Sequence, residues 1–336
     1  RIKYEDAINT YGTDKPDTRF DLNIKVLDKE LSGTEFNVFN RSLKDGGTIR
    51  GLSVPKHEAM TRKFYDKLNE FVRSIGGDGI IPISIDKKLS SIEFEDIKSP
   101  ISKFLNVENV KNVFNIFNSD SGDVILICAG KKNIVLESLG QVRNKLAEDF
   151  DLIDNEKLNF LFVTDFPLFE KDLESGNWTA MHHVFSSPNN ETIKYLDSDP
   201  NKVIGNLFDL VCNGVELGSG SIRIHDKKTQ EKVFSIIGYE DDQIQDRFGP
   251  LLESFDYGAP PHGGMGLGID RLVATFLNEN SIRDVISFPK TQSASDLLWG
   301  APSLIDEDQK KELSIKNIEE EGKNWKLIKV KLKTNK

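Results

Sequence analysis

The sequence contains little cysteine and no long apolar run. Only Cys128 and Cys212 occur among 336 residues, and both lie in apolar segments typical of buried strands. This excludes a disulfide framework and favours a reducing compartment, so we expect a cytoplasmic protein. No stretch approaches the roughly 18 consecutive apolar residues that a membrane-spanning helix requires. We therefore expect no membrane association.

Basic residues are also outnumbered by acidic ones. There are 44 Lys and Arg against 54 Asp and Glu, which gives a formal net charge of −10. This balance excludes a broadly basic surface, so a nucleic-acid partner must meet local patches or a part outside this sequence. The length suits two domains. The chain begins Arg1-Ile2-Lys3, with no Met and no signal-peptide pattern, and we expect it to be the interior of a longer protein.

A glycine-rich segment leads into a helix between Gly263 and Leu277. Four glycines fall within six residues, and the apolar residues that follow recur at helical spacing, which predicts a helix with one buried stripe. The stripe consists of Ile269, Leu272, Val273, Phe276 and Leu277. The glycine spacing excludes both a dinucleotide-binding fingerprint and a P-loop.

The first turn of this helix is a candidate anion site. Free N–H groups and a partial positive charge at a helix N-terminus suit a phosphate. Arg271 opposes the helix dipole there, and Asp270 together with a bound phosphate would compensate it. The alternative is a glycine-rich strand packed under a helix, with Arg271 paired to a surface carboxylate.

The dipeptide Asn213-Gly214 separates two strand-like runs and predicts a tight hairpin. A two-residue turn pairs Val211 with Glu216, and Asp209 shares their face. Two carboxylates then lie diagonally within reach of one divalent cation, and a Mg²⁺ carried by a nucleotide would remove their repulsion. The alternative is a pair of solvent-facing carboxylates on an exposed sheet.

Arg223 follows on the second strand of this hairpin, after Gly218-Ser219-Gly220. Regular pairing matches Leu210 with Leu217 and sends Arg223 to the face opposite Glu216. A bulge at the glycines would return it to the same face, where a guanidinium can grip a carboxylate in bidentate fashion. The alternative is a surface arginine on a sheet edge.

The other segments predict an α+β protein. Residues 22 to about 150 form a unit of their own, in which we find no catalytic constellation. Expected strands are Val38-Phe39, Ile49–Val54, Gly79–Ile85, Val124–Ala129, Phe160–Val163, Trp178–Phe185 and Ile282–Pro289. Expected helices are Tyr4–Tyr11, Met60–Ile75, Val107–Phe117, Asn133–Phe150, Lys227–Ile237 and Asp241–Phe255.

Two polar features accompany these elements. Thr13 to Asp17 predicts an ordinary polar turn after the first helix. The expected strand Trp178–Phe185 carries His182 and His183, whose side chains face opposite ways. One histidine can then line a site while the other packs, or both are structural.

Several of these segments resemble the C-terminal part of bacterial-type aspartyl-tRNA synthetase, a class II aminoacyl-tRNA synthetase. The resemblance continues through the histidine pair, the hairpin up to Arg223 and Ile282–Ile286, to about Ser303. The segments similar to the family's motifs are Gly266–Arg271 (the third signature motif), Tyr11–Asp17 (before an insertion), Ser99–Leu105 (within the insertion) and Asp165–Glu170 (the return to the catalytic sheet).

The resemblance implies a fold and a domain division. The fold is α+β, with an incomplete class II antiparallel catalytic sheet interrupted by a separate α+β insertion domain. The catalytic domain would comprise residues 1–29 and 151–303, the second part with the third signature motif. The insertion domain would span 30–150, and 304–336 would be a C-terminal extension.

The resemblance also implies an activity. ATP would activate L-aspartate to an adenylate, with Mg²⁺ as cofactor, and tRNA would take the aspartyl group in a full-length, homodimeric enzyme. By position, His182 and Arg223 match aspartate-binding residues, Asp209 and Glu216 match the metal ligands, and Arg223 and Arg271 match catalytic residues. The ATP-binding positions are Glu216, Gly268, Ile269, Asp270 and Arg271.

The sequence departs from the family in what it does not contain. We find no anticodon-binding barrel and neither of the first two signature motifs, including the arginine that grips the α-phosphate. We therefore expect this chain alone to be inactive, because the chemistry depends on positioning and electrostatics. The alternatives are a non-catalytic tRNA- or protein-binding fragment and an adenylate-forming amide ligase that uses no tRNA.

Overall fold

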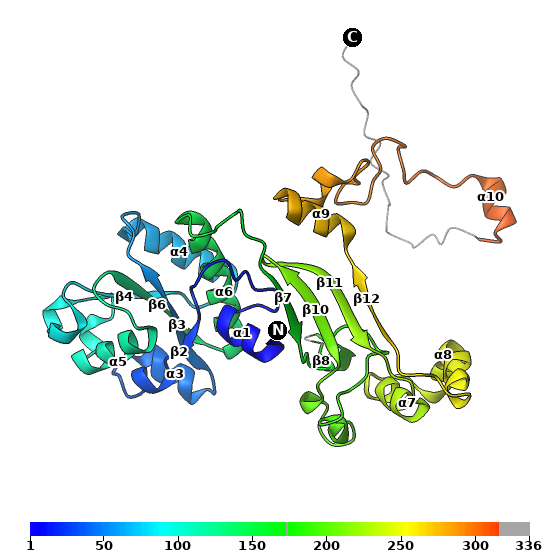
Figure 1. Ribbon diagram of the computed structural model, residues 1–336, viewed down its shortest axis with the longest axis horizontal. Helices are drawn as coiled ribbons and strands as arrows, with labels where there is room; N and C mark the ends of the chain where they lie inside the picture. Colours follow the sequence, from blue (N-terminus) through cyan, green and yellow to red (C-terminus); the bar gives the residue numbers. More distant parts are fainter. Residues whose placement is uncertain (173, 316–336) are drawn as a thin grey trace, which may run out of the picture. The chain divides into compact units, whose positions relative to one another are not determined.

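The computed structural model describes residues 1–172 and 174–315. The chain divides into two compact units, one of residues 1–285 and one that begins at residue 286 (Figure 1). The second unit contains helix α10 (Glu307–Glu312). The expected C-terminal extension lies outside the described residues from position 316 onward.

The first sheet of the first unit has five strands in the order β1-β7-β10-β11-β12. All neighbours pair antiparallel except β1 and β7, which are parallel. The chain leaves this sheet after β1 and returns to it at β7, which confirms an interrupted antiparallel sheet. The strands are β1 (Ile2–Lys3), β7 (Phe160–Thr164), β10 (Leu207–Cys212), β11 (Val215–Ile222) and β12 (Gly263–Leu267).

The hairpin of β10 and β11 turns at Asn213 and Gly214, as predicted. Both residues have a positive φ, 52° and 83°, which the tight turn requires. Val211 lies opposite Glu216, also as predicted, but Leu210 lies opposite Gly218. The extra residue of the bulge is therefore in front of the glycines and not among them, which corrects the predicted position.

The glycines of β11 instead allow the close approach of the next strand, β12. A Cβ on Gly218 would lie 2.6 Å from the Gly266 carbonyl oxygen, and one on Gly220 would lie 2.5 Å from the Gly264 carbonyl oxygen. Regular pairing with β12 at this spacing therefore requires glycine. The bulged residue, Leu217, is fully buried, and its carbonyl accepts a hydrogen bond of 2.8 Å from the Gly268 N–H.

The second sheet is antiparallel, with its five strands in the order β2-β3-β6-β4-β5, and has helices on both faces. One face packs against α4 and α6, and the other packs against α2, α3 and α5. Buried residues alternate between the two faces along β3, with Leu52 on the first and Ile49 on the second. The strands are β2 (Lys25–Val26), β3 (Thr48–Pro55), β6 (Asp123–Gly130), β4 (Ile81–Ile85) and β5 (Ile97–Lys98). The helices are α2 (Asp28–Leu31), α3 (Asn37–Lys44), α4 (Arg62–Ser74), α5 (Val107–Phe117) and α6 (Lys132–Asp149).

The remaining helices of the first unit agree with the sequence. They are α1 (Tyr4–Tyr11), α7 (Lys227–Ile236), α8 (Asp241–Asp256) and α9 (Ile269–Leu277). Helix α1 ends at Gly12, which adopts the left-handed conformation with a φ of 73°. None of the described helices combines the length and apolar character needed to cross a lipid bilayer.

Three expected strands are wrong. Val38-Phe39 belongs to α3, where the helical spacing brings the rings of Phe36 and Phe39 to a centroid distance of 4.9 Å. Trp178–Phe185 is a strand only over β9 (Trp178–Ala180), which pairs with β8 (Phe169–Lys171). The chain then turns, with the Ser186 N–H donating to the His183 carbonyl at 3.1 Å, so the histidine pair lies in a loop.

The third of these strands, Ile282–Pro289, begins as a 3₁₀ helix over Ile282–Val285. The Ser281 hydroxyl accepts a hydrogen bond of 3.2 Å from the Arg283 N–H and starts this turn. The expected burial is also wrong, because Ile282 is 43% exposed.

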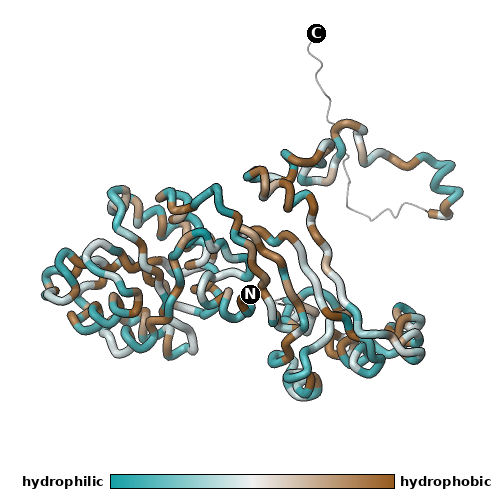
Figure 2. Tube along the Cα trace, viewed as in Figure 1, coloured by the Kyte–Doolittle hydropathy of each residue, from teal (hydrophilic) through white to brown (hydrophobic). Residues whose placement is uncertain are grey.

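The apolar stripe of α9 is not buried as predicted. Ile269, Phe276 and Leu277 are 60%, 53% and 62% exposed, and Ala274 is the buried residue of the helix. Figure 2 shows this helix as an apolar stretch at the end of β12. Leu272 is partly buried, since α9 packs against β11, and Phe276 makes an edge contact with the Phe160 ring at a centroid distance of 6.3 Å, but most of the stripe is exposed.

Candidate active site

The two carboxylates predicted to bind a metal lie on one face of the first sheet. Glu216 is opposite Val211, and Asp209 is two residues before Val211 on the same strand. Asp209 is 1% exposed, and its Oδ1 has no hydrogen-bond partner among the described residues. Burial raises the pKa of the Asp209 carboxyl, and the nearby charge of Glu216 acts in the same direction. Ser219 and His182 lower this pKa in part, but Asp209 Oδ1 remains a buried acceptor without a hydrogen bond among the described residues.

His182 lies beside Asp209. Its Nδ1 is 3.8 Å from Asp209 Oδ1 and 3.3 Å from the Ser219 hydroxyl oxygen. Its ring packs on Phe166 at a centroid distance of 4.6 Å. Ser219, which sequence reasoning missed, lies directly opposite Asp209 in the register. Its position follows from the bulge, which the sequence placed incorrectly.

Arg271 reaches Glu216 from the first turn of α9. Its Nη1 is 3.7 Å from Glu216 Oε1 and donates to the Glu216 carbonyl oxygen at 3.1 Å. Gly268 is the N-cap of α9, and Ile269 and Asp270 are the first helical residues. The glycine-rich segment is thus a strand, β12, and Arg271 pairs with a carboxylate of the site face.

Arg223 comes directly after β11, four residues beyond Ser219, and the alternation of the strand places it on the same face as Asp209. It pairs across an isolated bridge with Ser186. Arg223 Nη1 and the Ser186 hydroxyl are both buried, and neither has a hydrogen-bond partner in the part of the chain that the structure describes. Burial and then the Arg223 charge lower the pKa of His183. The two histidines therefore lie near different residues of the site, His182 near Asp209 and His183 near Arg223.

Lys15 is a further residue of the site that sequence reasoning missed. Its ammonium lies 2.9 Å from Glu216 Oε2. A lysine in a polar turn gives no functional signal in the sequence, because this contact depends on how the turn packs against the hairpin. A Cβ on Gly214 would lie 3.5 Å from the Asp17 Cβ and 3.8 Å from the Lys15 carbonyl oxygen, so the turn and the hairpin are in contact.

The donor set fits a metal that arrives with its own ligands. Among residues 1–172 and 174–315, no group of three or more His, Cys, Asp or Glu side chains is placed to hold a metal. Two carboxylates leave the other positions of an octahedral ion to water and phosphate oxygens, which is how Mg²⁺ is commonly bound. The unpartnered Asp209 Oδ1 and its neighbour Glu216 therefore fit Mg²⁺ carried by a nucleotide.

Comparison with known proteins gives the class to which this sheet and site belong. The family model described as tRNA synthetases class II (D, K and N) matches residues 1–292. The chain belongs to this family, and the predicted resemblance is confirmed.

The similar proteins are named as aspartate–tRNA ligases. Aspartate--tRNA(Asp/Asn) ligase of Caldanaerobacter subterraneus subsp. tengcongensis is 43% identical over 316 residues, which cover 94% of this chain and 52% of that protein. Aspartate--tRNA ligase of Clostridium perfringens (strain SM101 / Type A) is 42% identical over 322 residues, 96% of this chain and 53% of that protein. Aspartate--tRNA(Asp/Asn) ligase of Dehalococcoides mccartyi (strain CBDB1) is 42% identical over 319 residues, 94% of this chain and 53% of that protein. The chain spans about half the length of these relatives.

Proposed function

We propose that this chain is part of a cytoplasmic aspartate–tRNA ligase that activates L-aspartate with ATP and transfers the aspartyl group to tRNA. The family and the names of the relatives support this activity. The observation that carries it is a set of buried polar atoms without partners among the described residues, Asp209 Oδ1 and Arg223 Nη1, on one sheet face. Asp209 Oδ1 is suited to a cation, and Arg223 Nη1 is suited to a carboxylate.

In this proposal Arg223 and His182 bind L-aspartate. The Arg223 guanidinium presents planar donors, which match a carboxylate in bidentate fashion. The Ser186 hydroxyl lies across the bridge from Arg223 and adds a donor for the same group. His182, beside Asp209, lies toward the reacting end of the substrate.

ATP would lie along β11 and the start of α9. Asp209 and Glu216 hold the Mg²⁺, and Gly268, Ile269, Asp270 and Arg271 contact the nucleotide. When bound, Mg²⁺ supplies neutralising charge for the phosphates. Arg271 would add a second positive charge beside the pyrophosphate that leaves ATP. Holding aspartate and ATP on one face orients the carboxylate for in-line attack on the α-phosphate.

The rest of the enzyme would lie outside this chain. We propose that the missing half of the relatives' length supplies the arginine for the α-phosphate, the anticodon-binding domain and a homodimer interface. The division into catalytic residues 1–29 and 151–303, insertion domain 30–150 and extension 304–336 belongs to this proposal.

The assignment of Arg223 is tested in an active enzyme that contains this chain. Arg223→Lys should raise the aspartate KM by about tenfold or more and leave the ATP KM nearly unchanged, because an ammonium cannot reproduce a bidentate contact. Arg247→Lys is the matched control, since Arg247 is on α8 and its guanidinium lies over the Tyr239 ring. Equal effects of Arg223→Lys on both KM values would contradict the assignment.

A further inference from the structure

The cation closest to Glu216 is a lysine of the chain itself. Lys15 Nζ is 2.9 Å from Glu216 Oε2, while Arg271 Nη1 is 3.7 Å from the other oxygen, Oε1. Both Glu216 oxygens therefore already face a positive charge, on the side where the divalent cation is proposed to bind.

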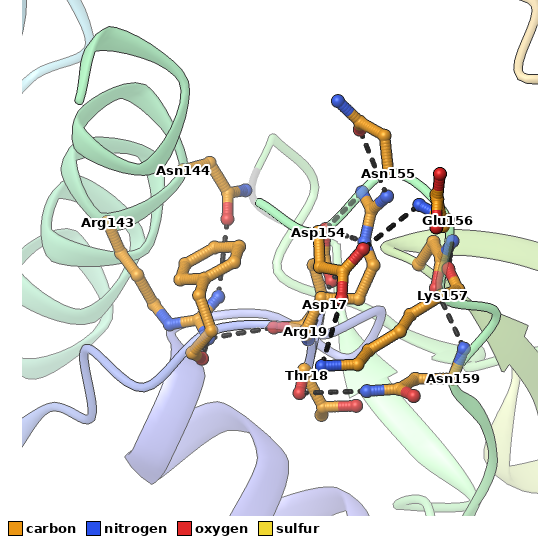
Figure 3. A network of polar contacts seen from close by, with 12 residues as sticks. Asp17, Thr18, Arg19, Arg143, Asn144, Asp154, Asn155, Glu156, Lys157 and Asn159 are labelled. Carbon is orange, nitrogen blue, oxygen red and sulfur yellow. Dashed lines mark hydrogen bonds and ion pairs between the residues drawn. The ribbon is translucent and has the colours of Figure 1, made fainter. Parts of the chain in front are cut away.

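The turn that carries Lys15 is fixed at its far end. Asp17 is 7% exposed and forms an ion pair of 2.7 Å with Arg19 (Figure 3). The Asn159 side chain donates to the Thr18 carbonyl oxygen at 3.0 Å, and the Asn159 N–H donates to the Asn213 side chain at 2.9 Å. Asn159, directly before β7, therefore ties the turn to the hairpin that carries Glu216.

Helix α6, which packs on the second sheet, contacts the segment that follows Lys15. Arg143 is fully buried and donates to the carbonyl oxygens of Asp17 at 2.7 Å, Phe20 at 2.9 Å and Leu22 at 3.1 Å (Figure 3). Its guanidinium also lies over the Phe20 ring, 3.9 Å from the centroid. A side chain that serves three carbonyls fixes the path of the backbone beyond Lys15. The ion pair of Lys15 with Glu216 is therefore built into the fold.

We propose that Lys15 is the resident counter-ion of the Asp209–Glu216 pair and that it competes with the divalent cation for Glu216. The inference rests on the proposed function, because it takes these two carboxylates as the metal ligands. The Lys15 side chain is 42% exposed, so the ammonium can move out when a metal enters. In the empty enzyme Lys15 keeps Glu216 on the site face and limits binding of a bare metal ion.

The test is a titration of this chain with Mn²⁺ alone, followed by the electron paramagnetic resonance signal of the free ion. Lys15→Gln should bind Mn²⁺ about two- to fivefold more tightly than the wild type, because a partly exposed ion pair of this kind contributes modestly. Lys15→Arg, which keeps the charge, should remain near the wild-type affinity. Unchanged or weaker binding by Lys15→Gln would overturn the proposal, because a purely structural lysine would not compete with the metal.

Two further variants separate the possible failures. Lys3→Gln is the matched control, since the Lys3 ammonium lies 3.9 Å from Asp165 and makes no contact with Glu216. Asp209→Asn should weaken Mn²⁺ binding if the metal site exists. If Asp209→Asn binds like the wild type, the metal site itself is wrong. If Asp209→Asn weakens binding and Lys15→Gln does not tighten it, only the role of Lys15 is wrong.

Discussion

Gly12 and Gly140 meet backbone to backbone. A Cβ on Gly140 would lie 2.8 Å from the Tyr11 carbonyl oxygen and 3.0 Å from the Gly12 Cα, and a Cβ on Gly12 would overlap the Leu136 carbonyl oxygen. Helix α1 follows the first strand of the first sheet, and α6 belongs to the second sheet. The two sheets are thus joined where no side chain fits between the two segments.

Gly140→Ala should destabilise the protein, although alanine favours a helix interior over glycine by about 1 kcal/mol. The new Cβ meets backbone atoms that no side-chain rotation can move away, and overpacking of this kind costs about 1–3 kcal/mol. Urea denaturation should show a net loss in the free energy of unfolding. Gly122→Ala, where a Cβ would meet nothing within 4 Å, is the control. A more stable Gly140→Ala variant would show that the two segments separate easily.

Arg143→Met should destabilise the protein by about 2–4 kcal/mol, because three buried carbonyl oxygens lose a charged donor. Burial lowers the pKa of Arg143 to about 10, so the guanidinium is still charged at neutral pH. Arg143→Lys should not restore stability, since one ammonium cannot reach all three carbonyls. Urea denaturation of both variants checks this. Wild-type stability of Arg143→Lys would contradict the requirement for a guanidinium that donates to three carbonyls at once.

The pKa of His183 should rise when the Arg223 charge is removed. Burial is the larger cause of its lowered pKa and Arg223 the second, so Arg223→Gln should move it part of the way back toward 6.5. A histidine with a lowered pKa in the folded state costs stability as the pH falls through that range, because the unfolded chain binds the proton more readily. NMR titration of the histidine side chains measures the shift. The control Arg247→Gln should leave the pKa of His183 unchanged. An unchanged pKa of His183 in Arg223→Gln as well would mean that Arg223 lies too far from His183 to affect it.

The segments that local rules govern were predictable. The hairpin follows from Asn213-Gly214, because few other pairs of residues accept two positive φ angles. Helices α4, α5 and α6 follow from apolar residues at helical spacing. The shared face of Asp209 and Glu216 then follows from the turn alone, since the bulge comes after Glu216.

The parts of the site that depend on packing were not predictable. The bulge was misplaced because Leu217 is drawn into the core, while Gly218 is required for the close approach of β12. The strand expected at the histidine pair ends early because a turn at His183 redirects the chain. The contact of Lys15 with Glu216 joins residues distant in the sequence, and it exists because Arg143 and the hairpin hold the turn in place.

This chain alone should not catalyse aspartate-dependent exchange of pyrophosphate into ATP. The sequence holds the proposed metal ligands and Arg271, but not the family's arginine for the α-phosphate, and catalysis by positioning fails when one such contact is missing. The assay uses the purified chain with ATP, Mg²⁺, L-aspartate and labelled pyrophosphate. Robust exchange would mean that the residues present form a sufficient site.

The proposed site depends most on Glu216, and pyrophosphate exchange in an active enzyme that contains this chain tests its role most directly. Glu216→Gln should reduce aspartate-dependent exchange by about 100-fold or more, because an amide replaces a charged metal ligand beside Arg271. The control Glu170→Gln, an exposed position on β8, should retain the wild-type rate. Exchange by Glu216→Gln at the wild-type rate, with the same dependence on Mg²⁺, would contradict the assignment of this sheet face as the site of aspartate activation.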